Sequence, residues 1–116
     1  MSDLTISPAE LRAALDGASA PLLLDVRRKP TFEAAPSMIP GAQWRDPYQV
    51  GSWADALPAE REVIVYCAHG LEIGRGVRDL LASIFKPSGR KVRYLQGGIE
   101  HWETNGLPTI AKQPKP

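Results

Sequence analysis

The sequence predicts an α/β domain with a largely parallel sheet. Largely apolar runs at residues 22–26 and 62–66 are typical of strands that are buried on both faces. Segments of helical period alternate with these runs, as they do in βαβ units. A chain of 116 residues is long enough to bury one core. We therefore expect one domain over residues 1–110 and a flexible tail over residues 111–116.

Composition narrows the class of protein. A formal net charge of +1 provides no basic field for nucleic acid. No apolar run approaches the roughly 20 residues of a membrane span, and the N-terminus lacks the basic and apolar regions of a signal peptide. The single cysteine cannot form an internal disulfide, and no Cys/His cluster has zinc spacing. We expect a cytoplasmic protein with no metal, no nucleic-acid partner and no membrane partner.

The first elements have clear boundaries. Ser7-Pro8-Ala9-Glu10 combines a capping serine, a proline at the first helical position and the glutamate of a capping box. Gly17 ends this helix, and the strand at residues 22–26 follows. Residues 31–35 can form one or two turns of helix before a proline interrupts them.

The middle of the chain contains shorter elements. Residues 39–42 read Ile-Pro-Gly-Ala and predict a tight turn, because proline presets its first central position and glycine accepts a positive φ at the second. A short strand at residues 42–44 and a weak helix over residues 48–55 follow. The strand at residues 62–66 then ends at Cys67.

The last elements follow the same alternation. From Leu71 onward, apolar residues fall on one face of a helix, which residues 87–89 interrupt. Residues 91–95 predict a strand, and Gly97-Gly98 turns the chain into a helix over residues 99–105.

Cys67 is the candidate nucleophile. It lies between a strand and a glycine-containing loop that opens a helix, and N–H groups and the dipole at a helix start favour negative charge. A buried structural thiol is the alternative. Ligands bind beyond the carboxyl ends of parallel strands. We therefore expect Asp25, Arg27 and the Gly97-Gly98 turn to lie near Cys67.

Four motifs resemble the single-domain rhodanese-like sulfurtransferase family. They are Leu24-Asp25-Val26-Arg27, Ile39-Pro40-Gly41-Ala42, Val63-Ile64-Val65-Tyr66-Cys67, and Leu95-Gln96-Gly97-Gly98 followed by Trp102, Gly106 and Pro108. The resemblance implies a three-layer domain with a mostly parallel five-stranded sheet and helices on both faces. It also implies that Cys67 carries sulfane sulfur as a persulfide, without a cofactor. The donor would be thiosulfate or a low-molecular-weight persulfide, and the acceptor a thiol, cyanide or a protein thiol. We expect a monomer or weak homodimer.

The resemblance and the residues together define a candidate site. Cys67 is its catalytic residue, and Asp25, Gly97 and Gly98 support it. The expected substrate-binding residues are Ala68, His69, Gly70, Leu71, Glu72, Ile73 and Arg27.

Several roles within the site stay open. His69 can hydrogen-bond the substrate or a loop carbonyl. Glu72 can line the pocket or pair with Arg75 or Arg27 outside it, whereas Arg28 and Lys29 are expected in solvent.

The loop after Cys67 departs from the common family pattern. An arginine followed by serine or threonine is common five residues after the cysteine, where this chain has Glu72 and Ile73. A carboxylate there repels an anionic donor such as thiosulfate, unless it points away or is paired.

Two other functions compete with sulfur transfer. The first is a non-catalytic rhodanese-like module that binds a partner or senses oxidants, which Glu72 favours. The second is a phosphatase or arsenate reductase, whose loop needs an arginine six residues after the cysteine. Ile73 occupies that position, and Arg75 comes too late.

Overall fold

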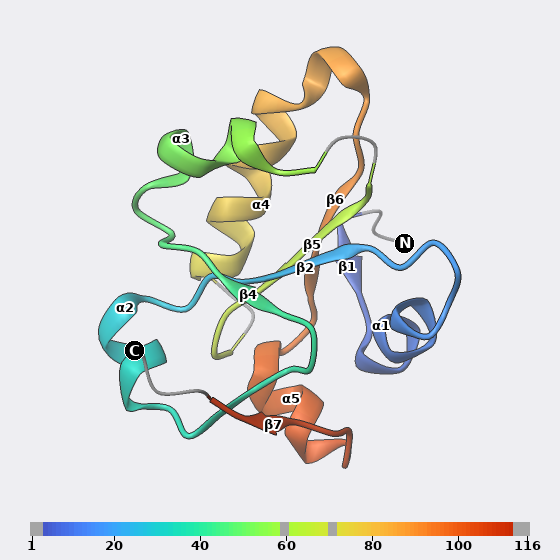
Figure 1. Ribbon diagram of the computed structural model, residues 1–116, viewed down its shortest axis with the longest axis vertical. Helices are drawn as coiled ribbons and strands as arrows, with labels where there is room; N and C mark the ends of the chain where they lie inside the picture. Colours follow the sequence, from blue (N-terminus) through green and yellow to red (C-terminus); the bar gives the residue numbers. More distant parts are fainter. Residues whose placement is uncertain (1–3, 59–60, 70–71, 113–116) are drawn as a thin grey trace.

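The centre of the protein is a parallel sheet of five strands in the order β1-β6-β5-β2-β4 (Figure 1). The computed structural model describes residues 4–58, 61–69 and 72–112. The sheet contains β1 (Thr5–Ile6), β2 (Leu22–Asp25), β4 (Gln43–Trp44), β5 (Val63–Tyr66) and β6 (Val92–Leu95). A separate antiparallel pair joins β3 (Ser37–Met38) to β7 (Ile110–Ala111).

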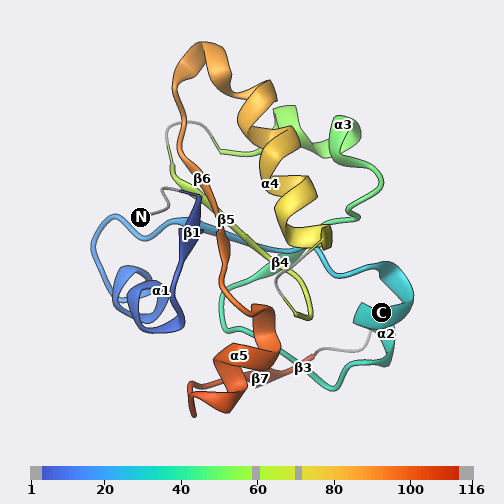
Figure 2. The ribbon, with the colours of Figure 1, turned by 180° about the vertical axis from the view of Figure 1, so that it is seen from behind.

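Helices cover both faces of the sheet (Figure 2). The α-helices are α1 (Pro8–Leu15), α2 (Lys29–Ala34), α3 (Val50–Trp53), α4 (Glu72–Ile84) and α5 (Gly98–Thr104). Two 3₁₀ turns, η1 (Ala54–Ala56) and η2 (Lys86–Ser88), follow α3 and α4. The helices α3 and α4 pack with η1 on one face, while α1 and α5 pack on the other. This is the expected three-layer α/β fold.

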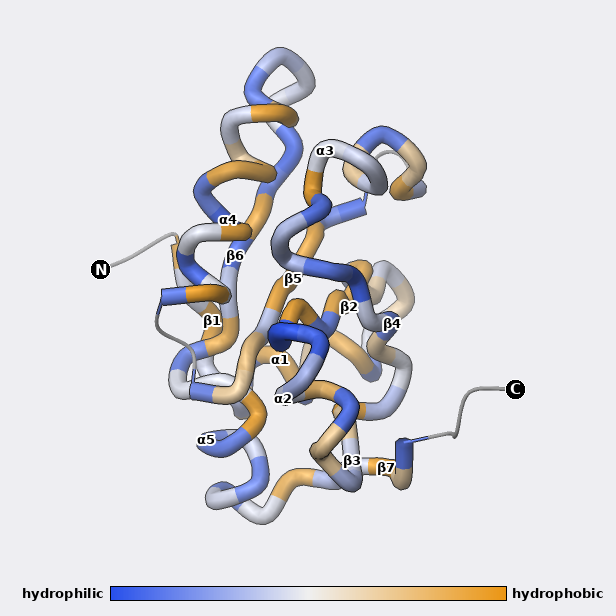
Figure 3. Tube along the Cα trace, turned by 90° about the vertical axis from the view of Figure 1, so that its left-hand side faces the viewer, coloured by the Kyte–Doolittle hydropathy of each residue, from blue (hydrophilic) through white to orange (hydrophobic). Residues whose placement is uncertain are grey.

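The strands β2 and β5 are buried along their whole length. Because side chains alternate along a strand, each strand supplies both cores. In β5, Val63 and Val65 join the core beneath α4, and Ile64 and Tyr66 join the core beneath α5. Figure 3 shows hydrophobic residues concentrated along these central strands. The position of a residue at the end of either strand therefore decides whether its side chain lies on the face covered by α4 or on the face covered by α5.

The strongest local signals in the sequence correspond to observed elements. The backbone N–H of Glu10 donates to Ser7 Oγ at 3.1 Å, and the N–H of Ser7 donates to Glu10 Oε1 at 2.9 Å, which completes the predicted capping box. The predicted turn also forms: Ala42 N–H donates to the Ile39 carbonyl at 3.1 Å, and Gly41 has a φ of 84°.

The shortest elements differ from the prediction. The strands β1, β3 and β7 contain two residues each, which is too few to show the alternating side-chain pattern of a strand. No sequence motif predicted them. The weak helix predicted over residues 48–55 is shorter and divides into α3 and η1.

The antiparallel pair of β3 and β7 lies where the predicted domain meets the predicted tail. Ala111 pairs with Ser37 in the antiparallel strands, and Lys112 N–H donates to the Pro36 carbonyl at 3.0 Å. The paired chain therefore continues into the predicted tail, of which residues 113–116 lie outside the described residues.

A buried ion pair joins the carboxyl ends of the central strands. Asp25 and Arg27 are 0% and 3% exposed, and Arg27 Nη2 lies 2.6 Å from Asp25 Oδ2. Arg27 Nε lies 3.0 Å from both carboxylate oxygens. Arg27 Nη2 also donates to the Ser37 carbonyl at 3.0 Å, which attaches β3 to the sheet.

Tyr66 completes this network from the neighbouring strand. It is the register partner of Asp25 across β2 and β5. Its hydroxyl donates to Asp25 Oδ2 at 3.0 Å and accepts from Ile39 N–H at 3.2 Å. Burial, and then the negative charge of Asp25, raises the pKa of Tyr66 far above its ordinary value. Burial opposes the charge of Arg27, but the hydrogen bond and charge of Asp25 outweigh it and raise the pKa of Arg27.

Helix α5 holds the first part of the Cys67 loop. Ile99 N–H donates to the Cys67 carbonyl at 3.0 Å, and Glu100 N–H donates to the Ala68 carbonyl at 3.1 Å. Gly98 makes this approach possible. It has a φ of 62°, and a Cβ there would lie 2.4 Å from the Cys67 carbonyl oxygen and 2.6 Å from that of Ala68.

Removing the Tyr66 hydroxyl should destabilise the fold. Tyr66→Phe leaves the buried Ile39 N–H without its acceptor and takes one donor from Asp25, so we expect a loss of about 1–3 kcal/mol in the free energy of unfolding. Urea denaturation measures this loss. Tyr94→Phe is the matched control, because the Tyr94 hydroxyl makes no hydrogen bond to a described residue. Equal midpoints for the two variants would contradict a stabilising network.

Gly98→Ala should destabilise the protein more than Gly106→Ala. Both glycines have positive φ, at which an alanine costs about 1–2 kcal/mol, but a Cβ at Gly106 would meet nothing within 4 Å. The alanine at position 98 also collides with two carbonyl oxygens. Urea midpoints measure the difference, and equal losses in the two variants would show that the close approach carries no energetic weight.

Candidate active site

Cys67 lies at the end of β5, against the first turn of α4. It is 7% exposed. The strand alternation directs its side chain to the face covered by α4, opposite to Tyr66. The contact with the helix is close: a Cβ on Gly74 would lie 3.3 Å from Cys67 Sγ. Because Gly74 has no side chain, the positive end of the 13-residue helix approaches the sulfur, where it stabilises negative charge.

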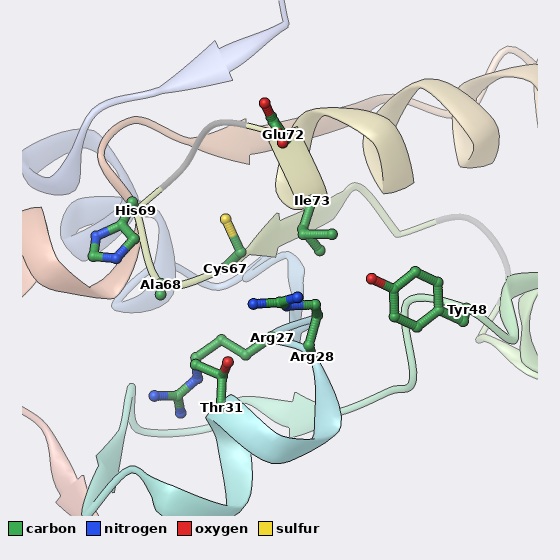
Figure 4. Close-up of a pocket in the computed structure, with 9 residues that line it drawn as sticks. All are labelled: Arg27, Arg28, Thr31, Tyr48, Cys67, Ala68, His69, Glu72 and Ile73. Carbon is green, nitrogen blue, oxygen red and sulfur yellow. The ribbon is translucent and has the colours of Figure 1, made fainter.

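A pocket with a volume of about 460 Å³ opens beside Cys67 (Figure 4). Its walls come from the β2–α2 connection, α2 itself, the segment before α3, the loop after β5 and the start of α4. The lining residues are Arg27, Arg28, Thr31, Tyr48, Cys67, Ala68, His69, Glu72 and Ile73. These segments lie far apart in the sequence and meet at the carboxyl edge of the sheet, as the parallel topology predicts.

Most of the candidate residues that the structure describes meet here. Cys67, Ala68, His69, Glu72, Ile73 and Arg27 line the pocket. Gly70 and Leu71 lie outside the described residues.

The expected supporting residues lie just outside the pocket. Asp25 belongs to the buried network, and Gly98 packs on the carbonyls of Cys67 and Ala68. Gly97 has a φ of 72°, and a Cβ there would lie 2.3 Å from His101 Cβ, so no side chain fits at this turn.

The two neighbouring arginines have different surroundings. The Arg27 guanidinium donates hydrogen bonds to Asp25 and to the Ser37 carbonyl. It points away from Cys67, although Arg27 lines the pocket (Figure 4). The sequence predicts that Arg28 lies in solvent. It is exposed, but its guanidinium points toward Cys67 from the start of α2 (Figure 4). The structure therefore adds Arg28 to the candidate site.

His69 and Glu72 differ in their contacts. His69 Nδ1 lies 3.0 Å from Glu100 Oε2 on α5, and both side chains are largely exposed. Glu72 lines the pocket, and within the described residues it forms no ion pair with Arg75 or Arg27.

Sequence reasoning missed Thr31 and Tyr48. Both line the pocket, and Tyr48 is 68% exposed with its hydroxyl turned toward the cavity (Figure 4). Neither follows a strand directly, so position along the chain gave no signal.

Within the described residues, no group of three or more His, Cys, Asp or Glu side chains could hold a metal ion. Across the same part of the chain, no helix is both long enough and apolar enough to cross a membrane.

Comparisons with known proteins agree with this geometry. The family model described as a rhodanese-like domain matches residues 7–105. A protein named sulfurtransferase from Allochromatium vinosum is 32% identical over 92 residues, which cover 79% of this chain and 80% of that protein. The probable adenylyltransferase/sulfurtransferase MoeZ of Mycobacterium tuberculosis is 32% identical over 91% of this chain, but the match spans only 26% of MoeZ.

Solved structures show the same fold. A rhodanese-related protein from Thermoplasma volcanium has a TM-score of 0.71 at 21% identity, over 92% of this chain and 97% of that one. A thiosulfate sulfurtransferase from Pseudomonas aeruginosa has a TM-score of 0.74 at 27% identity, over 92% of this chain and 19% of that one. Together with the family match over most of its length, these likenesses show that the chain belongs to the rhodanese-like domain family, whose relatives here include proteins named sulfurtransferases.

Proposed function

We propose that this protein is a sulfurtransferase that carries sulfane sulfur as a persulfide on Cys67. The observation that supports the proposal most is the position of Cys67 Sγ, between an open pocket and the first turn of α4. A thiolate is the nucleophilic form of cysteine, and the positive end of a helix stabilises it. The pocket provides access for a small donor.

The reaction proceeds in two displacements. In the first, the Cys67 thiolate attacks the outer sulfur of the donor. A new S–S bond forms, the old bond to that sulfur breaks, and the leaving group departs with the electron pair as a thiolate or sulfite. In the second, an acceptor thiolate or cyanide attacks the outer sulfur and restores the Cys67 thiolate. The chain itself needs no oxidant or reductant, because each step exchanges one bond to sulfur for another.

Ile73 argues against a phosphatase-type reaction. It lines the pocket at the position where such an enzyme needs an arginine to clamp the oxyanion. Arg75 is exposed on α4 and does not line the pocket.

Exposure to a sulfane-sulfur donor should add about 32 Da, one sulfur atom, to the intact protein. Cys67 is the only cysteine, so a thiol-linked gain can arise there alone. Cys67→Ser should show no gain and no transfer to an acceptor. Intact-mass analysis after exposure to thiosulfate and to small persulfides measures this result. If no donor loads Cys67, the proposal fails and a non-catalytic binding or redox-sensing module becomes the better explanation.

Gly74→Ala should slow sulfur loading of Cys67, whereas Gly76→Ala should not. Both alanines replace glycines inside α4 and gain similar helix propensity, but only the methyl at position 74 would lie 3.3 Å from Sγ. A Cβ at Gly76 would meet nothing within 4 Å. A small displacement of a reacting atom can cost up to about 100-fold in rate, so we expect at least about a 10-fold loss for Gly74→Ala. Loading reactions that are quenched at successive times and analysed by mass spectrometry measure the rates. Equal rates would show that the helix contact does not shape the reaction.

A further inference from the structure

Two opposite charges in the pocket have no partner among the residues that the structure describes. Arg28 and Glu72 both line the cavity, and among the described residues neither forms an ion pair or a side-chain hydrogen bond. Arg27, by contrast, has its charge balanced by Asp25. Of the lining residues that the structure describes, Arg28 is therefore an available cation and Glu72 an available anion.

These charges lie on different sides of the sulfur. In Figure 4 the Arg28 guanidinium is on one side of Cys67 and Glu72, at the start of α4, is on the other. The hydroxyls of Thr31 and Tyr48 form no hydrogen bonds with described residues and add neutral donors to the same cavity. A volume of about 460 Å³ is within the range of pockets that hold small organic ligands.

The charge pattern selects among donors. A purely anionic donor gains Arg28 but meets repulsion from Glu72, and a purely cationic donor has the reverse difficulty. A donor with one group of each sign gains both interactions. Charge-assisted hydrogen bonds to a carboxylate or a guanidinium are stronger than neutral ones, so the difference between these donors should be measurable.

We propose that the sulfur donor is a low-molecular-weight persulfide that carries an ammonium and a carboxylate, as an amino-acid or small-peptide persulfide does. Its carboxylate binds Arg28, its ammonium binds Glu72, and its outer sulfur faces Cys67 Sγ. This inference rests on the proposed function, because it uses persulfide formation at Cys67. The Cys67 thiolate forms the bond to the outer sulfur, the donor S–S bond breaks, and the donor leaves as its thiolate with the electron pair.

The test compares loading rates of Cys67 for small persulfides that differ in which charged groups they carry. Cysteine persulfide carries both groups, 3-mercaptopropionate persulfide lacks the ammonium, cysteamine persulfide lacks the carboxylate, and 2-mercaptoethanol persulfide lacks both. We expect cysteine persulfide to load about 10-fold faster than either singly charged donor. A glutathione persulfide arm distinguishes an amino-acid donor from a peptide donor, since glutathione carries its ammonium farther from the sulfur and has a second carboxylate.

Two variants test the assigned contacts. Glu72→Gln should remove the advantage of cysteine persulfide over 3-mercaptopropionate persulfide and leave its advantage over cysteamine persulfide. Arg28→Gln should do the opposite. Glu33→Gln on α2 and Arg75→Gln on α4 remove the same charges outside the pocket and should leave the donor ranking unchanged.

The outcomes separate this inference from the proposed function. Equal loading by all the persulfides, or a donor ranking that neither pocket variant changes, would overturn the inference while leaving sulfur transfer intact. Absence of loading by every donor would overturn both. A faster reaction with cysteine or glutathione persulfide that Glu72→Gln and Arg28→Gln each reduce selectively would support it.

Discussion

The buried ion pair between Asp25 and Arg27 is the interaction on which the edge of the sheet depends. Removing two charges from water is costly, and only close hydrogen bonds can offset that cost. Here the carboxylate receives donors from Arg27 and Tyr66, and the guanidinium also reaches the Ser37 carbonyl. One cluster therefore holds β2, β5 and β3 together directly beneath the candidate active site.

This pairing also determines which charges are left for a ligand. Arg27 points into the protein because Asp25 lies two residues before it at the end of β2. The next residue, Arg28, lies at the start of α2 and points toward the cavity. Two adjacent arginines thus divide structural and ligand-facing roles, and Glu72 provides a second charge in the pocket from α4.

The sequence was informative where a signal extended over several residues. The buried strands, the capping box before α1 and the position of Cys67 between β5 and α4 could all be predicted. The strands β1, β3 and β7 could not, because two residues show no period and their pairing depends on distant chain segments. The roles of Arg27 and Arg28 were equally inaccessible, since adjacent identical residues differ only in their tertiary neighbours. Tyr48 enters the pocket from a loop, so no strand end indicated it.

The alternation of side chains in β5 has a consequence for the evolution of this site. Tyr66 belongs to the network beneath α5, while the next residue, Cys67, faces α4. Deleting or inserting one residue within the strand would exchange these faces and bring the sulfur into the polar network and the phenol beneath the helix. One inserted or deleted residue would therefore reverse the face that each later side chain of the strand occupies. A change of length after Cys67 leaves this alternation unaffected, whereas a change of length within the strand would remove both the hydroxyl network and the candidate nucleophile from their positions.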